Sequence, residues 1–210
     1  AHDERDFVFA KKYNTDIKIV IEPVTGVPQD NEEYRKSIVA LIEDQESGKV
    51  LSINWGKLGG NLFVGGGLEG NEDPSATAFR EIQEETGYRN VELISQSEVI
   101  HHHYFAASKN VRRSIDAQGF YFRLIDHEKI EQKLEEDEAG KFSIEWLTKE
   151  EASRKIDDSL HKYIFEKFIQ GKIYTEDGIL VDSGEFTGLT SAEARTKMTK
   201  WLQSEGLGDQ

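Results

Sequence analysis

The alternation of apolar and polar positions gives the middle of this chain a pattern of strands and helices. Residues 37–42 and 49–54 are rich in Ile, Val and Leu and predict two strands, with the turn-forming residues 46–48 between them. Residues 91–105 and 118–125 predict an antiparallel pair joined by a loop at 108–116. Residues 142–146 predict one more strand. The expected fold class is therefore α/β, with a mixed sheet flanked by helices.

Two of the expected helices follow the last strand, at residues 149–155 and 159–169. The second has apolar side chains at helical spacing on one stripe: Leu160, Tyr163, Ile164 and Phe168. This spacing predicts a helix that packs one face against the sheet.

A third helix is predicted between Asp73, a suitable N-cap followed by Pro74, and Gly87, a suitable end. A short strand at 61–64 and a flexible glycine loop at 65–67 are expected before it. One side of this helix is predicted to pack against the core through Ala76, Ala78, Phe79, Ile82 and Thr86.

The opposite side of this helix concentrates negative charge. Glu81, Glu84 and Glu85 stand at i, i+3 and i+4, so their carboxylates project from one face. Like charges at this spacing repel, so the cluster is either a solvated face or a binding site for a hard cation. Arg80 lies at the border of the two faces, where it can pair with Glu72 or Glu81.

The full pattern is Gly66-x5-Glu72-x7-Arg80-Glu81-Ile82-Gln83-Glu84-Glu85-Thr86-Gly87-Tyr88. At every fixed position it resembles the Nudix box of the Nudix hydrolases, with the strand, loop and helix that the box requires. The resemblance implies an α/β/α sandwich. It also implies an enzyme that hydrolyses a nucleoside diphosphate linked to another moiety.

By the same resemblance, Glu84 and Glu85 are the main ligands of Mg²⁺ or Mn²⁺, helped by the backbone carbonyl of Gly65. Glu81 ligates the metal or orients water, and Glu72 and Arg80 support the ligands. A divalent ion suits the implied substrate, because it neutralises phosphate charge and lowers the pKa of an attacking water. An acidic residue outside the box often assists in this family, and four candidates remain open: Glu136, Asp137, Glu138 and Glu145.

Other candidate site residues have a structural interpretation as well as a functional one. Lys109, Arg112 and Arg113 in the loop at 108–116 either bind substrate phosphate or are solvated charge. Trp55 either stacks on a base or belongs to the core. Residues 101–103 are three histidines, but alternate residues of a strand face opposite sides, so a half-buried strand is favoured over a metal site.

Composition limits the class of protein further. The chain has 210 residues, a formal net charge of -14, no cysteine and a mean hydropathy of -0.62. The charge argues against a broad nucleic-acid surface, and the acidic run at 135–138 is expected to be solvated. Disulfides and thiolate metal sites are excluded. With no predicted membrane span and no apolar signal segment, a cytoplasmic location is expected.

The two ends have a different character from the centre. Residues 1–13 predict a helix followed by a strand at 17–21, and residues 178–189 are followed by a helix at 191–204. Together these stretches resemble consecutive pieces of the editing domain of leucyl-tRNA synthetase. The expected organisation is a Nudix domain at 34–171 inserted between flanks at 1–33 and 172–210, with contact to tRNA only through a parent leucine–tRNA ligase.

Within that resemblance, Asp6 matches the editing-domain aspartate that binds the amino group of a mischarged amino acid, and Asp3 lies one helical turn earlier. The threonine-rich segment of the editing domain is absent. Three hypotheses follow: a metal-dependent Nudix hydrolase, a catalytically idle module that binds a nucleotide or the tRNA acceptor end, and part of a post-transfer editing deacylase.

Overall fold

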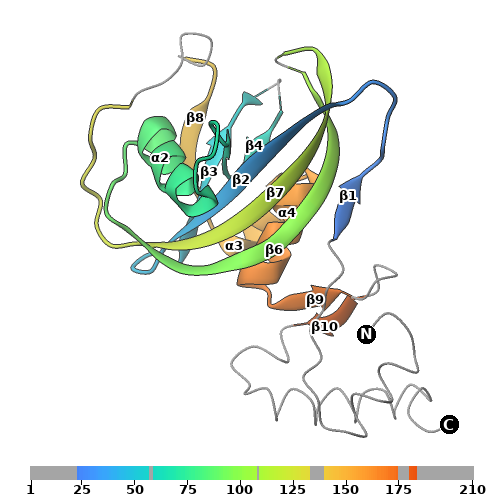
Figure 1. Ribbon diagram of the computed structural model, residues 1–210. Helices are drawn as coiled ribbons and strands as arrows, with labels where there is room; N and C mark the ends of the chain where they lie inside the picture. The colour runs from blue at the N-terminus through green and yellow to red at the C-terminus, as the bar shows by residue number, and fades with distance from the viewer. Residues whose placement is uncertain (1–22, 57–58, 108, 133–139, 175–179, 184–210) are drawn as a thin grey trace, which may run out of the picture.

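The computed structural model describes residues 23–56, 59–107, 109–132, 140–174 and 180–183 (Figure 1). The predicted elements at 1–21 and 191–204, together with Asp3 and Asp6, lie outside these residues. No helix in the described part of the chain is long and apolar enough to cross a membrane.

Eight strands form one mixed sheet, in the order β1-β6-β7-β2-β3-β4, with β5 paired to β2 and β8 paired to β3. These strands are β1 (Val24–Gly26), β2 (Glu33–Asp44), β3 (Lys49–Asn54), β4 (Asn61–Leu62), β5 (Val64–Gly67), β6 (Val91–Ala106), β7 (Val111–Leu124) and β8 (Ser143–Leu147). The long antiparallel hairpin of β6 and β7 runs diagonally across the molecule (Figure 1). It is joined to the rest by parallel pairing of β7 with β2.

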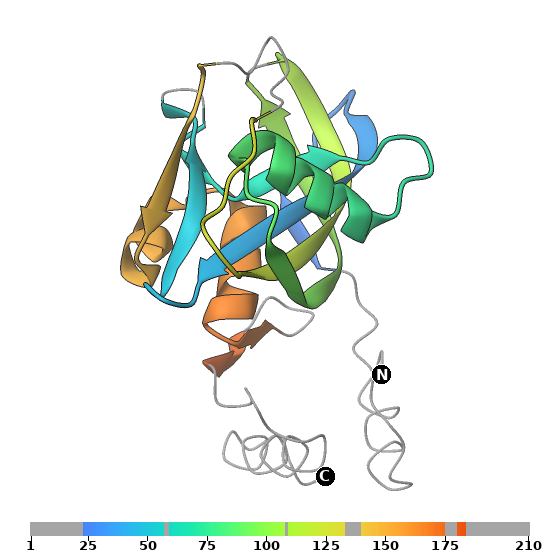
Figure 2. The same ribbon diagram turned by 90° about the vertical axis from the view of Figure 1, so that its left-hand side faces the viewer.

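Helices cover both faces of the sheet: α2 (Pro74–Thr86) lies in front of it and α4 (Ser159–Ile169) behind it (Figure 2). Along β2, alternate residues enter two separate hydrophobic clusters. Ile38, Ala40 and Ile42 join the cluster under α2. Val39 and Leu41 join the cluster under α4, which also includes Ala152 of α3 (Lys149–Lys155). The predicted α/β fold with helices on both faces is confirmed.

The three predicted helices form with the expected ends. Asp73 caps α2 by accepting hydrogen bonds from the N–H groups of Ser75 and Ala76, and Gly87 ends it in a left-handed conformation with φ of 76°. The prediction that Ala76 packs against the core was wrong, because it is exposed and Thr77 is buried instead. A capping box at Thr148 starts α3, and Asp158 caps α4.

Two predicted loops are strands in the structure. The glycines expected to form a flexible loop at 65–67 belong to β5, paired with residues 37–39 of β2. The loop expected at 108–116 is shorter, because β7 already begins at Val111 and Arg112 and Arg113 are part of it. Hydrophobic patterning missed the glycines of β5 and the first half of β7, since glycines and charged residues hide the alternation on which strand prediction depends. The strand expected at 118–125 is confirmed as the second half of β7.

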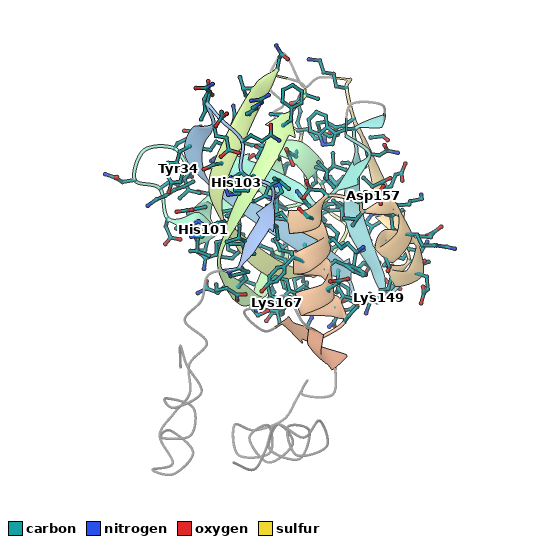
Figure 3. All side chains as sticks on the ribbon, turned by 90° about the vertical axis from the view of Figure 1, so that its right-hand side faces the viewer. Tyr34, His101, His103, Lys149, Asp157 and Lys167 are labelled. Atoms are coloured by element: carbon teal, nitrogen blue, oxygen red, sulfur yellow. The ribbon has the colours of Figure 1, made fainter. Side chains whose placement is uncertain are left out.

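The three histidines 101–103 lie in β6, as the favoured reading predicted, and each contacts a carboxylate. His101 Nδ1 lies 2.5 Å from Asp116 Oδ1, and His103 Nδ1 lies 2.9 Å from Glu32 Oε2. Figure 3 shows these two histidines on one part of the surface with Tyr34, whose hydroxyl donates to Asp116. The middle histidine is buried on the opposite side of β6.

Short strands precede and follow the central part of the chain. β1 pairs in parallel with residues 101–103 of β6 and brings residues 24–26 into the main sheet. After α4, β9 (Lys172–Tyr174) and β10 (Leu180–Ser183) form a separate antiparallel pair. The sequence pattern predicted neither β1 nor β9.

Candidate active site

A cavity of about 730 Å³ lies where α2, β5, the start of α4 and the turn between β6 and β7 approach one another. Its wall contains the three carboxylates of α2 together with four cationic side chains. The charged residues of the lining are Arg35, Glu69, Arg80, Glu81, Glu84, Glu85, Lys109, Arg113 and Asp158. Opposite charges are therefore concentrated in one space.

The acidic wall is formed by one face of α2, as the helical spacing predicted. Glu81, Glu84 and Glu85 all line the cavity. Glu85 is the most deeply placed, with 6% of its surface exposed. Because Ala78 and Ile82 anchor the helix on the sheet, these carboxylates are held on a rigid element.

Arg80 organises this wall. Its Nη1 donates to Glu81 Oε1 and to Glu84 Oε2, both at 2.9 Å. Its Nε and Nη2 donate to the two oxygens of Glu72 at 3.1 and 3.0 Å, and Nη2 also donates to the carbonyl of Gly67. Both predicted partners of Arg80 are confirmed.

These contacts change proton affinities as charge-assisted hydrogen bonds should. The hydrogen bonds that Arg80 donates lower the pKa of Glu72 to about 2, and acceptance of these bonds by Glu72 and the α2 carboxylates raises the pKa of Arg80. Glu72 does not line the cavity. Its position behind Arg80 suits the supporting role that the Nudix resemblance implies.

The glycines of β5 leave space for charged side chains on both sides of the strand. A Cβ atom on Gly66 would lie 2.0 Å from the carboxyl carbon of Glu81. A Cβ atom on Gly67 would lie 3.1 Å from Nη1 of Arg35. Because neighbouring residues of a strand face opposite sides, the carboxylate of Glu81 packs against one face of β5 and the guanidinium of Arg35 against the other.

The basic wall consists of Arg35 on β2, Lys109 in the turn and Arg113 on β7. The sequence pointed to Lys109 and Arg113 but missed Arg35. The sequence also grouped Arg112 with Lys109 and Arg113, but Arg112 does not line the cavity. Its side chain is exposed, and its Nη1 donates to the carbonyl of Asp30 at 3.2 Å. Alternation along β7 is the reason, since adjacent residues face opposite sides.

The start of α4 adds two residues that sequence reasoning missed. Asp158 and His161 line the cavity, 77 to 80 residues beyond the acidic helix face that begins at Glu81. Asp158 caps α4 and lies 3.5 Å from Nε2 of His102, whose Nδ1 is 2.9 Å from the hydroxyl of Thr25. Burial opposes the charge on Asp158, but His102 and His161 outweigh it and hold the pKa of this carboxyl well below its usual range.

His161 is held as a neutral imidazole with a defined tautomer. Its Nδ1 accepts the backbone N–H of Phe63 at 3.0 Å, so the ring proton is on Nε2. Burial lowers the pKa of His161 to about 4, against the opposing influence of Asp158. From the sequence alone, a single histidine in a predicted amphipathic helix gives no indication that it lines a cavity.

Of the remaining predicted site residues, some line the cavity and others do not. Trp55 packs on Phe142 with ring centroids 4.9 Å apart and against the cluster under α2, so the core interpretation is confirmed. It also lines the cavity, and stacking on a base stays a prediction. Glu145 does not line the cavity; hydrogen bonds from Asn54 and Asn61 hold its pKa below the ordinary value. The other three acidic candidates, Glu136, Asp137 and Glu138, lie outside the described residues.

The donor set suits a hard divalent cation. Three carboxylates line the same cavity as Gly65 and offer oxygen ligands, which Mg²⁺ and Mn²⁺ prefer. In the described part of the chain, however, no three acidic or histidine side chains already converge as a coordinating group. Arg80 instead holds Glu81 and Glu84, so coordination requires these carboxylates to turn away from it.

The sequence model of the NUDIX domain matches residues 24–168 of this chain. The chain belongs to the NUDIX family. The match includes β1 through most of α4, and thus every described residue of the cavity lining.

Solved structures agree with this assignment at the level of the fold. The MutT protein from Methanosarcina mazei Go1 superimposes with a TM-score of 0.50 at 16% sequence identity, covering 67% of this chain and 96% of that one. At this identity the likeness concerns the NUDIX fold alone.

The NUDIX domain is joined to sequence of a second kind. Leucine–tRNA ligase from Syntrophobacter fumaroxidans is 54% identical over 37 residues, and that from Hahella chejuensis is 54% identical over 41 residues. These matches cover 18% and 20% of this chain but only 4% and 5% of the two ligases. The chain therefore combines a NUDIX domain with a short portion that resembles leucine–tRNA ligase.

Proposed function

We propose that this protein is a divalent-metal-dependent hydrolase of a nucleoside diphosphate linked to another moiety. The observation that carries the proposal is the single cavity in which Glu81, Glu84 and Glu85 face a cluster of cations. Phosphoryl transfer needs both groups, since positive charge binds the phosphates and carboxylates hold a metal and accept the proton of water.

The reaction is the hydrolysis of a phosphoric anhydride. A water oxygen bonds to phosphorus, the bridging P–O bond breaks, and the departing phosphate keeps the electron pair while a proton passes to solvent. Glu84, Glu85 and the Gly65 carbonyl would hold Mg²⁺ or Mn²⁺, which when bound supplies charge neutralisation and a more acidic water. Glu81 would orient that water, and Arg80 would keep the carboxylates in position.

The direct test replaces single carboxylates. Glu84→Gln and Glu85→Gln should each lower kcat/KM roughly 100-fold or more, because an amide is neutral and neither ligates a cation strongly nor accepts a proton. Glu128→Gln is the matched control, since Glu128 is an exposed surface partner of Arg89. Hydrolysis is measured with and without a chelator, and Mn²⁺ binding is followed separately. Undiminished turnover in either cavity variant would refute the assignment.

A catalytically idle nucleotide-binding module is the second candidate. It is supported by the ion pairs between Arg80 and two of the three carboxylates, which leave the acidic wall partly neutralised. Calorimetry with Mg²⁺ and a nucleotide panel separates the two candidates. Binding with no product favours the idle module, whereas product formation that depends on Glu84 favours the enzyme.

We also propose that the NUDIX unit at 34–171 is an insertion between flanks at 1–33 and 172–210 that derive from a leucine–tRNA ligase editing domain. The contact between β1, which precedes this unit in the chain, and α4, its last helix, supports this, because the two ends of an inserted unit should lie close together. A role for Asp3 and Asp6 in editing, and contact with tRNA through the parent ligase, belong to the same proposal. Full-length ligase that clears mischarged tRNA normally after Asp6→Ala would argue against that role.

A further inference from the structure

We infer that Arg35, Lys109 and Arg113 form an anion subsite that selects nucleoside polyphosphates. Such substrates carry at least one ionised phosphate beyond the diphosphate presented to the α2 carboxylates. ADP-ribose and nucleotide sugars, which end in a neutral sugar, would lack the group that this subsite binds. The inference rests on the proposed function, since it specifies which substrate that site would hydrolyse.

The three cations share one cavity and have no carboxylate partner among the residues described there, although the same cavity contains four acidic residues besides Asp158. Within the described ranges, none of the three forms an ion pair or a side-chain hydrogen bond. Six other basic residues of the same ranges do pair with carboxylates: Arg80, Arg89, Arg123, Lys149, Lys155 and Lys167. In a chain with a net charge of -14, three unpaired cations in one cavity indicate an external anion.

Burial strengthens the argument for the two arginines. Nε of Arg35 and Nε of Arg113 are both buried and have no hydrogen-bond acceptor. A buried N–H without an acceptor is costly, and most such groups in native proteins are satisfied by a ligand or water. A phosphate offers several strong acceptor oxygens, and the guanidinium fork matches its geometry.

The strands place these two side chains on the same face of the sheet. In the parallel register of β2 and β7, Arg35 pairs with Ile115, so Arg113 is its diagonal neighbour two residues earlier. Arg113 also pairs across β6 with Tyr104, another residue of the cavity lining. Gly67 provides the space in which the guanidinium of Arg35 lies.

The subsite lies beside the acidic wall, and β5 separates the two. Gly66 faces Glu81 and the next residue, Gly67, faces Arg35, so the two charged groups are one strand residue apart along β5. Both charged groups nevertheless line one cavity that continues around β5, and in this proposal a linear polyphosphate places one phosphate at the carboxylates and another at the arginines. A substrate with a neutral group in the second position would leave the arginine charges uncompensated.

The chain offers matched control variants on the same strands. Arg35→Gln and Arg113→Gln remove the proposed contacts. Lys36→Gln and Arg112→Gln remove a neighbouring positive charge that faces away from the cavity on β2 and β7. All four variants lose one charge, so any general effect of net charge is common to them. Thermal unfolding of each variant establishes that it is folded.

Steady-state kinetics with Mg²⁺ on the full chain provides the first test. ATP and diadenosine tetraphosphate should have kcat/KM values roughly 10-fold or more above those of ADP-ribose and UDP-glucose. Arg35→Gln and Arg113→Gln should each lower kcat/KM for the polyphosphates roughly 10- to 100-fold, with little change for the sugar-linked substrates. Lys36→Gln and Arg112→Gln should behave as the unchanged protein.

These outcomes separate the inference from the proposed function. Faster hydrolysis of ADP-ribose or UDP-glucose than of the polyphosphates, still dependent on Glu84, would overturn the subsite and leave the hydrolase assignment intact. Equal losses for both substrate classes in the Arg35 and Arg113 variants would also overturn it, because the arginines would then contact only the shared diphosphate.

Equilibrium binding supplies a test that needs no turnover. Inorganic tripolyphosphate titrated into the metal-free protein should bind, and Arg35→Gln and Arg113→Gln should each weaken its Kd roughly 10-fold, whereas Arg112→Gln should not. Absence of tripolyphosphate binding, or the same Kd in all variants, would refute the anion subsite even if the protein hydrolyses none of the four substrates.

Discussion

Two adjacent glycines determine which charged groups reach the cavity. Gly66 allows the Glu81 carboxylate to approach the backbone of β5, and Gly67 allows Arg35 to do so from the other side. Neither glycine has a positive φ, so neither is required by a left-handed backbone conformation. Their importance is the missing side chain, which explains why a glycine run that resembles a flexible loop in the sequence is a paired strand.

A single added methyl group tests this explanation. Gly66→Ala should displace Glu81 and lower kcat/KM roughly 10-fold or more, with a small effect on thermal stability because the displaced group is the flexible end of a side chain. Gly59→Ala is the control, since Gly59 has no proposed catalytic role and the atom nearest to its Cβ, Cβ of Trp55, lies 3.7 Å away. Equal activity in the two variants would contradict the proposed role of Gly66.

At the scale of elements, α4 connects the cavity to the far edge of the sheet. His161 accepts the N–H of Phe63 between β4 and β5, while Asp158 contacts His102 on β6. His102 in turn contacts Thr25 on β1. The start of one helix thus links three parts of the sheet through buried polar groups, and such networks are sensitive to the loss of a single member.

The titration of His161 should be visible in the stability of the protein. Its folded-state pKa of about 4 lies below the ordinary value of 6.5, so between these pH values the unfolded chain binds more protons. The free energy of unfolding should therefore fall as the pH decreases from 6.5 towards 4, with a contribution from this residue on the order of 2–3 kcal/mol.

Denaturant unfolding at several pH values measures this contribution. In His161→Gln the amide oxygen can still accept the Phe63 N–H, but the side chain no longer titrates. Its free energy of unfolding should depend less on pH over the same interval. A variant that loses stability as steeply as the unchanged protein would show that other groups cause the effect.

At the scale of the whole molecule, the described residues form two hydrophobic clusters on the two faces of one sheet. Both hydrophobic clusters consist of residues between Ile38 and Ile169. β1 adds an edge strand that contacts α4, and the family match begins at the same strand. The match therefore begins ten residues before the predicted domain boundary at residue 34.

A fragment of residues 23–171 should therefore fold by itself. It keeps both clusters, and we expect one cooperative thermal transition with a Tm within about 4 °C of the full chain. Circular dichroism in the near ultraviolet measures it, and a fragment of residues 34–171 tests the contribution of β1. A broad transition in the 23–171 fragment would mean that the flanks are part of the folding unit.

Much of this protein was predictable because the decisive signals are local. The caps at Asp73 and Gly87 define α2, and the spacing of Glu81, Glu84 and Glu85 places three carboxylates on one side of it. These features depend on contacts within a few residues, which a single sequence contains.

The basic half of the cavity was decided by the tertiary structure. Arg35 and Arg113 come from β2 and β7, and only strand pairing brings them into one cavity with the α2 carboxylates. The direction of Arg112 away from the cavity likewise depends on where β7 begins, because each shift of one residue reverses the face. The sequence by itself thus determined the acidic helix, whereas long-range pairing determined the cations that face it.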